Sequence, residues 1–156
     1  MKWIEAVGEY SLREWIAGLK LVGNVIEWFD FSLGSESEVR PVELKDVSSA
    51  IGTVHYHPYE HSKVPIPSIS DGVNWVYHSF WEISDDLNPI FFIVFKDKYA
   101  SWAMFPKPPV VRKLWREEYS RVRNEREASV NLCLKLLDKG LIKAGIFMLG
   151  RKTRNF

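Results

Sequence analysis

The apolar residues in the first part of the chain form short runs separated by turn-forming residues. Residues 15–23 and 25–31 are two such runs with Asn24 between them, a pattern that predicts two antiparallel strands joined by a turn. A third run predicts a buried strand over residues 50–57, which ends there because Pro58 has no N–H to give to a sheet. These three strands form the first half of a predicted β-sheet.

Helical spacing marks other parts of the chain. Residues 69–83 place apolar side chains three and four positions apart, which predicts a helix. Residues 110–139 are charged and helical in pattern, and the polar stretch 123–127 either bends this helix or divides it in two. Residues 3–14 are ambiguous, because Gly8 weakens an otherwise helical apolar face. The inward-facing positions predicted for the C-terminal helical segment are Leu114, Trp115, Val122, Val130, Cys133, Leu134 and Leu137.

Three further apolar runs complete the pattern. Residues 90–95 and 99–105 flank a short polar turn, which predicts a β-hairpin whose first strand is buried on both faces. Gly140 is a natural stop for the preceding helix. Residues 144–149 then predict a last strand. The order of elements predicts a mixed α/β (α+β) fold in one domain that spans residues 1–156.

Composition agrees with a single packed domain and narrows the chemistry. The chain has 156 residues, 46% of them hydrophobic, which suffices for one full core. Cys133 is the only cysteine, so an intrachain disulfide and a cysteine-based zinc knuckle are excluded. A metal would have to be held by His, Asp or Glu. The sequence has no signal-peptide pattern and no apolar run long enough to span a membrane, so we expect a cytoplasmic protein without a membrane partner.

Candidate chemistry gathers at the end of the predicted 50–57 strand. Three of the four histidines, His55, His57 and His61, fall within seven residues. Alternate residues of a strand point to the same face, so His55 and His57 project side by side. Asp71 begins the predicted helix beyond the intervening loop. Two imidazoles and one carboxylate form the ligand set of a catalytic zinc, which keeps a fourth position for water.

Each half of this pattern also has a purely structural interpretation. Ser68 and Asp71 form a Ser-x-x-Asp capping box, which can serve only to begin a helix. A His-x-His pair at a strand end is more often incidental than a metal site. His61 is interpreted as a loop residue and His78 as a structural or surface histidine. The combination of both halves in one order, across one loop, favours the metal site.

These residues carry a family resemblance. Residues 55–58 (His-Tyr-His-Pro) followed by 67–71 (Pro-Ser-Ile-Ser-Asp) resemble the signature of the JAMM (MPN+) zinc metalloproteases, in which a His-Ser/Thr-His-Pro segment is followed by Ser-x-x-Asp. The resemblance covers roughly residues 10–105, and the chain looks most like the prokaryotic single-domain members. It departs from the pattern at Tyr56, where Ser or Thr is usual, and in a longer loop between Pro58 and Ser68.

The resemblance implies a fold, a cofactor and residue roles. The fold is a central mixed β-sheet flanked by helices, of the cytidine-deaminase-like type. The cofactor is Zn²⁺, with His55, His57 and Asp71 as ligands. Ser68 would help to stabilise the tetrahedral intermediate. Tyr56 should point away from the metal.

The family also requires an upstream glutamate as general base. It usually lies in a Glu-x-x-Gly-x-x-x-Gly segment, and the nearest match begins at Glu14, with one extra residue on each side of Gly18. Glu9 and Glu27 are the rivals, although Glu27 can equally be a solvent-facing strand residue. We favour Glu14.

The resemblance therefore implies a zinc-dependent isopeptidase or peptidase that cleaves at the C-terminal tail of a ubiquitin-like modifier or a small sulfur-carrier-type protein. The alternative is a non-catalytic MPN-like scaffold or protein-binding module, which a damaged glutamate position would favour. A third idea is nucleic-acid contact by the basic 110–139 segment and the 151–156 tail. The acidic residues interleaved there, and a net charge of +1, favour a solvated helix face instead. The sequence does not decide whether the protein forms a homo-oligomer.

Overall fold

The structure is a computed structural model, and it describes residues 2–44, 47, 49–58, 85, 88–95 and 99–148. The predicted 69–83 helix, with Ser68 and Asp71 at its start, lies outside these residues, and so does the basic 151–156 tail. The described part of the chain is a mixed α/β fold with six strands in one mixed sheet. The fold class is therefore as the sequence predicted at this level.

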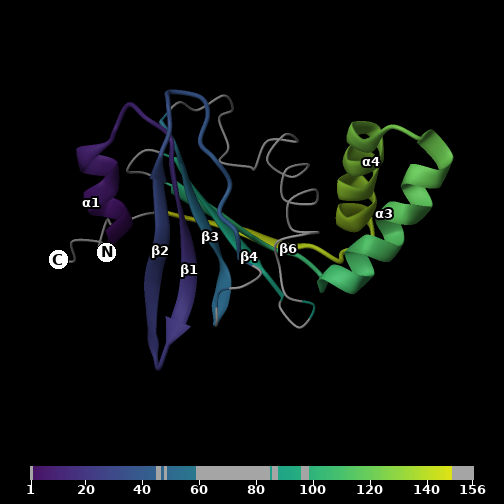
Figure 1. Ribbon diagram of the computed structural model, residues 1–156, viewed down its shortest axis with the longest axis horizontal. Coiled ribbons are helices and arrows are strands. Elements are labelled where there is room, and N and C mark those ends of the chain that lie inside the picture. Colours follow the sequence, from purple (N-terminus) through teal and green to yellow (C-terminus); the bar gives the residue numbers. More distant parts are fainter. Residues whose placement is uncertain are drawn as a thin grey trace.

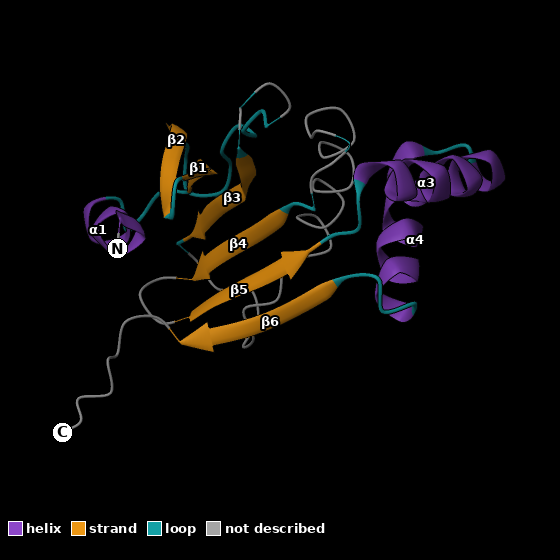
Figure 2. Cartoon of the chain, turned by 90° about the horizontal axis from the view of Figure 1, so that it is seen from below, coloured by secondary structure: helices purple, strands orange, loops and turns teal. Residues whose placement is uncertain are grey.

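The six strands lie in the order β2-β1-β3-β4-β5-β6, and Figure 2 shows the strands as a twisted sheet. All neighbours are antiparallel except β3 and β4, which are parallel. Parallel neighbours need a crossover connection, and here residues 58–89 make it. The bounds are β1 Trp15–Val22, β2 Val25–Leu33, β3 Ala50–His57, β4 Ile90–Phe95, β5 Tyr99–Met104 and β6 Lys143–Met148.

Three helices are described: α1 Lys2–Glu9, α3 Pro108–Val122 and α4 Glu125–Asp138. Figure 1 shows α1 on one side of the sheet and the α3–α4 pair on the other. The ambiguous 3–14 segment is thus a helix followed by a turn. The longest of these helices has 15 residues, and none of the described helices is long and apolar enough to cross a membrane.

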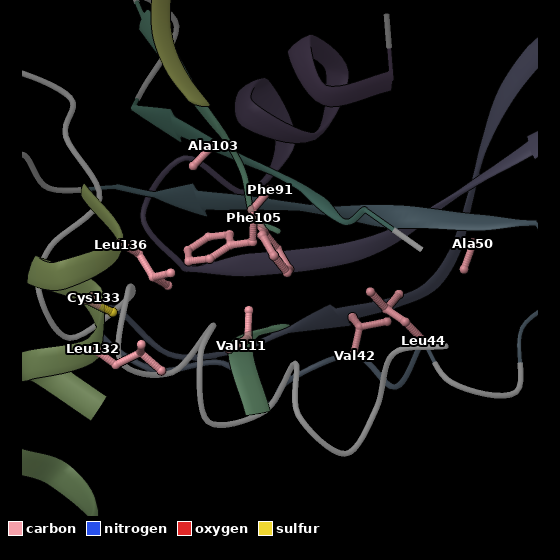
Figure 3. Close-up of a cluster of buried hydrophobic side chains, with 10 residues drawn as sticks. All are labelled: Val42, Leu44, Ala50, Phe91, Ala103, Phe105, Val111, Leu132, Cys133 and Leu136. Atoms are coloured by element: carbon pink, nitrogen blue, oxygen red, sulfur yellow. The ribbon is translucent and has the colours of Figure 1, made fainter. Parts of the chain in front are cut away.

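Alternation along the strands divides the buried side chains between two clusters. The first cluster packs beneath α1 and consists of Ala6, Val7, Trp15, Ala17, Leu19, Val54, Tyr56, Val94 and Ala100. The second packs beside α3 and α4, where Figure 3 shows Leu132, Cys133 and Leu136 near Phe91 and Phe105. Each face of the sheet therefore has its own core. Within the second cluster, burial raises the pKa of the Cys133 thiol to about 12.

The C-terminal helical segment divides where the sequence left the choice open. Arg123 adopts a left-handed conformation with φ 51°, which ends α3. The Asn124 side chain then accepts a hydrogen bond from the Glu127 backbone N–H, so it begins α4 as an N-cap. Gly140, with φ 64°, follows the end of α4 as predicted.

Two predicted inward positions on α4 are wrong. Leu134 and Leu137 are 53% and 56% exposed, whereas Leu132 and Leu136 are fully buried. Apolar residues occur all around this helix, so spacing alone allows two different inward faces. The observed face is the one that contains Ala128, Ser129 and Cys133 as well.

Candidate metal centre

His55 and His57 lie on β3, the strand between β1 and β4 near the middle of the sheet. Their neighbours Val54 and Tyr56 point into the core beneath α1. Because side chains alternate along a strand, both histidines point to the opposite face. Their ring centroids are 4.5 Å apart with the planes at 78°. The sequence prediction of two adjacent imidazoles on one face is consistent with this geometry.

Glu14 reaches the same place from the start of β1. The antiparallel register sets Ile16 opposite His55 and Trp15 opposite Tyr56, so Glu14 arrives at the end of β3 that carries His57. Its backbone is held at the end of β2, where its N–H donates to the Ser35 carbonyl at 2.6 Å and its carbonyl accepts from Gly34 N–H at 2.8 Å. The pairing of β1 with β3 and the residues just after β2 therefore fix the backbone from which the Glu14 carboxylate projects.

The three side chains converge. One ligand atom from each of Glu14, His55 and His57 lies within 4.8 Å of the others, and the group could hold a metal ion. Glu14 Oε2 is 3.2 Å from His55 Nε2, and both side chains are only 13% exposed. Imidazole nitrogen and carboxylate oxygen are ligands that zinc accepts, and imidazole also suits copper, iron and nickel. The donor set thus fits the zinc that the resemblance implies.

Apolar surroundings support the group. The His57 ring meets the Phe95 ring edge-on, with centroids 5.4 Å apart. Phe95 is His57's partner in the parallel β3–β4 register and is itself buried. An apolar wall lowers the local dielectric and so strengthens the attraction between a cation and its ligands.

The rival glutamates lie elsewhere. Glu9 ends α1, is exposed, and accepts a hydrogen bond from the Tyr10 hydroxyl that raises the pKa of Tyr10. Glu27 is exposed on β2 opposite Lys20, toward the β1–β2 turn and away from the histidines. Among the described residues, only Glu14 joins the histidines. Asp71 and Ser68 fall outside the described residues, so their roles stay predictions.

Sequence reasoning missed the segment that holds Glu14. Residues 32–41 are rich in Ser, Gly and Glu, a composition that predicts only a loop, yet Gly34 and Ser35 form hydrogen bonds with the Glu14 backbone. The segment is tightly closed, because Ser35 N–H donates to Glu38 O, and a Cβ on Gly34 would lie 1.8 Å from that same oxygen. A glycine beside serines and glutamates was the available signal, but nothing in the sequence tied it to Glu14.

Comparisons of this chain with models of known protein families, with characterised proteins and with solved structures found no match.

Proposed function

We propose that this protein is a zinc-dependent metallopeptidase of the JAMM type, with a JAMM-type fold. The observation that carries the proposal is the convergence of Glu14 with His55 and His57. The resemblance needs a glutamate from a distant part of the chain beside the His-x-His pair. Glu14 precedes His55 by 41 residues, and its carboxylate lies within hydrogen-bond distance of that imidazole. The sequence motif and the spatial grouping are independent supports.

In this proposal His55, His57 and Asp71 hold the metal. Bound zinc would polarise the scissile carbonyl and lower the pKa of a water molecule to about 7. Glu14 is the general base instead of a ligand, because Asp71 supplies the carboxylate of the ligand set. The limited exposure of Glu14 and His55, together with Phe95 behind His57, keeps bulk water away from the group.

Glu14 carries out the proton transfers of the proposed reaction. Its carboxylate accepts a proton from the water whose oxygen bonds to the scissile carbonyl carbon. The same carboxyl then returns the proton to the leaving nitrogen as the C–N bond breaks. The products are a carboxylate at the end of the ubiquitin-like tail and an ammonium group, because the second proton of the water passes from the new carboxyl group to the amine. The Ser68 hydroxyl donates a hydrogen bond to the negative charge that develops on the carbonyl oxygen.

The substrate side of the proposal rests on the resemblance. It is the C-terminal tail of a ubiquitin-like modifier or a small sulfur-carrier-type protein. Such a tail is extended, and an extended peptide binds by adding a strand to an exposed backbone edge.

Metal content is the first test. Purified wild-type protein should carry about one zinc per chain, as expected for a three-ligand site, and His57→Ala should lose it. Glu27→Gln is the matched control, since Glu27 lies on the β1–β2 hairpin that follows Glu14 but apart from the histidines. Wild-type protein that binds no metal would remove the basis of the proposal.

Cleavage of a ubiquitin-like fusion is the second test. Glu14→Gln should keep zinc and lose roughly 100-fold to 10,000-fold of the rate, which is the usual contribution of a general base. Loss of zinc as well would make Glu14 a ligand. A normal rate in Glu14→Gln would show the base assignment to be wrong. A wild type that binds zinc and cleaves no ubiquitin-like fusion would favour the scaffold alternative.

A further inference from the structure

We propose that Tyr56 positions Glu14 for its role as general base, an inference that rests on the proposed function. Tyr56 separates the two histidines in sequence but lies on the other face of β3, where it is 1% exposed. Its hydroxyl donates a hydrogen bond to the Ser11 backbone carbonyl at 3.0 Å. Ser11 precedes Glu14 by three residues, in the turn that carries the chain from α1 into β1.

The turn between Ser11 and Glu14 has little freedom of its own. Tyr10 N–H donates to Ala6 O at the end of α1, and Arg13 N–H donates to Tyr10 O at 3.2 Å. Arg13 Nε also donates to Gly34 O at 2.7 Å, beside the two backbone bonds of Glu14. The turn is thus fixed on one side to the end of β2 and on the other to Tyr56.

Tyr56 also contacts the residue that follows Glu14. Its ring stacks on Trp15, with centroids 5.3 Å apart and planes at 17°, and the two residues are register partners. Glu14 therefore stands between two segments that Tyr56 touches, one before it and one after it. A hydroxyl on Cβ, as in the Ser or Thr usual in the family, could not reach Ser11 from this position. The departure from the motif is accordingly the feature that ties the turn to the histidine strand.

The expected effect of Tyr56 on the rate follows from the short distance between the Glu14 carboxylate and the His55 ring. The Glu14 carboxylate lies 3.2 Å from His55 Nε2, so it acts at hydrogen-bond range. A displacement of about 1 Å in a group that must meet a reacting atom can reduce a rate by roughly 100-fold. Loss of the Tyr56 hydroxyl would free the turn on its β3 side while leaving the histidines in place. Tyr56 is therefore a positioning residue, and its effect should pass through Glu14.

The test is a double-mutant cycle of Tyr56→Phe with Glu14→Gln in the zinc-loaded protein. Tyr56→Phe should lower kcat by about tenfold with little change in KM, because positioning acts on the reacting group and not on substrate binding. In the Glu14→Gln background the same change should have almost no further effect. Tyr119→Phe is the matched control, since Tyr119 is an exposed α3 residue stacked on Trp115.

A spectroscopic arm gives a readout besides activity. The visible absorption of the Co²⁺-substituted protein should shift in Tyr56→Phe in the same direction as in Glu14→Gln, with the dissociation constant for Co²⁺ changed less than fivefold, because the histidine ligands are untouched. Tyr119→Phe should match wild type. A purely structural role for Tyr56 would lower the melting temperature and leave the spectrum and kcat of the folded protein unchanged.

The outcomes separate this inference from the proposed function. If wild type neither binds metal nor cleaves, the proposed function fails and the inference fails with it. If wild type is active and Tyr56→Phe matches it in kcat and spectrum, only the inference is overturned. Equal effects of Tyr56→Phe with and without Glu14→Gln would overturn it too. Should Tyr56→Phe not fold, Arg13→Gln tests the other anchor of the turn, and an unchanged kcat and spectrum there would overturn the positioning of Glu14 by this turn.

Discussion

Gly52 lies on β3 three residues before His55, where the strand must approach β4 closely. Its φ is 153°, and an added Cβ would lie 1.6 Å from the Ile90 carbonyl oxygen. Backbone cannot move aside as a flexible side chain can. We expect Gly52→Ala to lower the free energy of unfolding by at least about 2 kcal/mol, from strain and a steric clash together. Denaturant unfolding followed by circular dichroism measures this change.

Gly8→Ala is the matched control for Gly52→Ala. Gly8 lies within α1, and a Cβ there would meet nothing within 4 Å. Alanine is the better helix former, so this variant should gain roughly 0.5–1 kcal/mol. Equal effects of the two substitutions would contradict the close approach of β3 and β4 at Gly52.

For single residues, the sequence predicts which side chains could bind a metal better than it predicts which side chains lie together in space. The His-x-His pair was evident, because strand alternation alone places both rings on one face. The choice of the general base among Glu9, Glu14 and Glu27 was not evident, because it depends on the register that sets Ile16 opposite His55. Register is fixed by contacts between distant segments, and the sequence does not display it. Only the resemblance favoured Glu14.

Glu118 joins α3 to α4 and is the buried charge of this helix pair. Its side chain is 3% exposed, accepts a hydrogen bond from Lys135 on α4, and contacts Arg121 at 3.3 Å. The Lys135 hydrogen bond is the main reason that the pKa of Glu118 lies below its ordinary value of 4.5. Lys135 and Arg121 are thereby engaged within the protein, which fits a structural role for part of the basic C-terminal segment.

A lowered folded-state pKa fixes the sign of the pH dependence. Folding favours the ionised Glu118, so its stabilisation is complete above about pH 4.5 and is lost as the pH falls through the lower folded-state pKa. We expect Glu118→Gln to lower the free energy of unfolding by about 2 kcal/mol at neutral pH, where Lys135 loses a charged partner. The difference from wild type should shrink below about pH 4. Urea unfolding at several pH values measures both effects.

Glu117→Gln is the control for Glu118→Gln, because Glu117 is an exposed neighbour on the same helix. It should change the free energy of unfolding by less than about 0.5 kcal/mol at any pH. A Glu118→Gln deficit that persists unchanged in acid would mean that the carboxylate charge is not what holds α3 to α4.

At the scale of elements, apolar runs bounded by turn residues predicted the strands to within a residue or two. The run at 15–23 became β1 Trp15–Val22, and the 90–95 run became β4 Ile90–Phe95. The helical segments were harder. On α4 the buried face could not be chosen, because Leu134 and Leu137 compete with Leu132 and Leu136 at helical spacing. Only packing against Phe105 and its neighbours decides between those faces.

At the scale of the whole molecule, the order of the strands in the sheet brings the residues of the site together. β3 pairs with β1 on one side in an antiparallel register and with β4 on the other side in a parallel register. The first pairing brings Glu14 to the histidines, and the second brings Phe95 against His57. Alternating hydrophobicity predicts that these strands exist, but it does not state which strands are neighbours. That step needs the global arrangement, and it could not be read from any one segment.

The same arrangement predicts that metal binding stabilises the entire fold. His55 and His57 lie beside Glu14 because β3 pairs with β1, so the site that would bind the metal exists in the folded chain and is lost on unfolding. With free Zn²⁺ at about 100 times its dissociation constant, mass action adds about 2.7 kcal/mol, or roughly 5–10 °C in melting temperature for a chain of this size. Differential scanning fluorimetry with Zn²⁺ and with EDTA should show this shift in wild type and in Glu27→Gln. The shift should vanish in His57→Ala. A wild-type melting temperature that is the same in Zn²⁺ and in EDTA would mean that the three side chains meet without holding a metal, because a ligand that binds only the folded state must raise its stability.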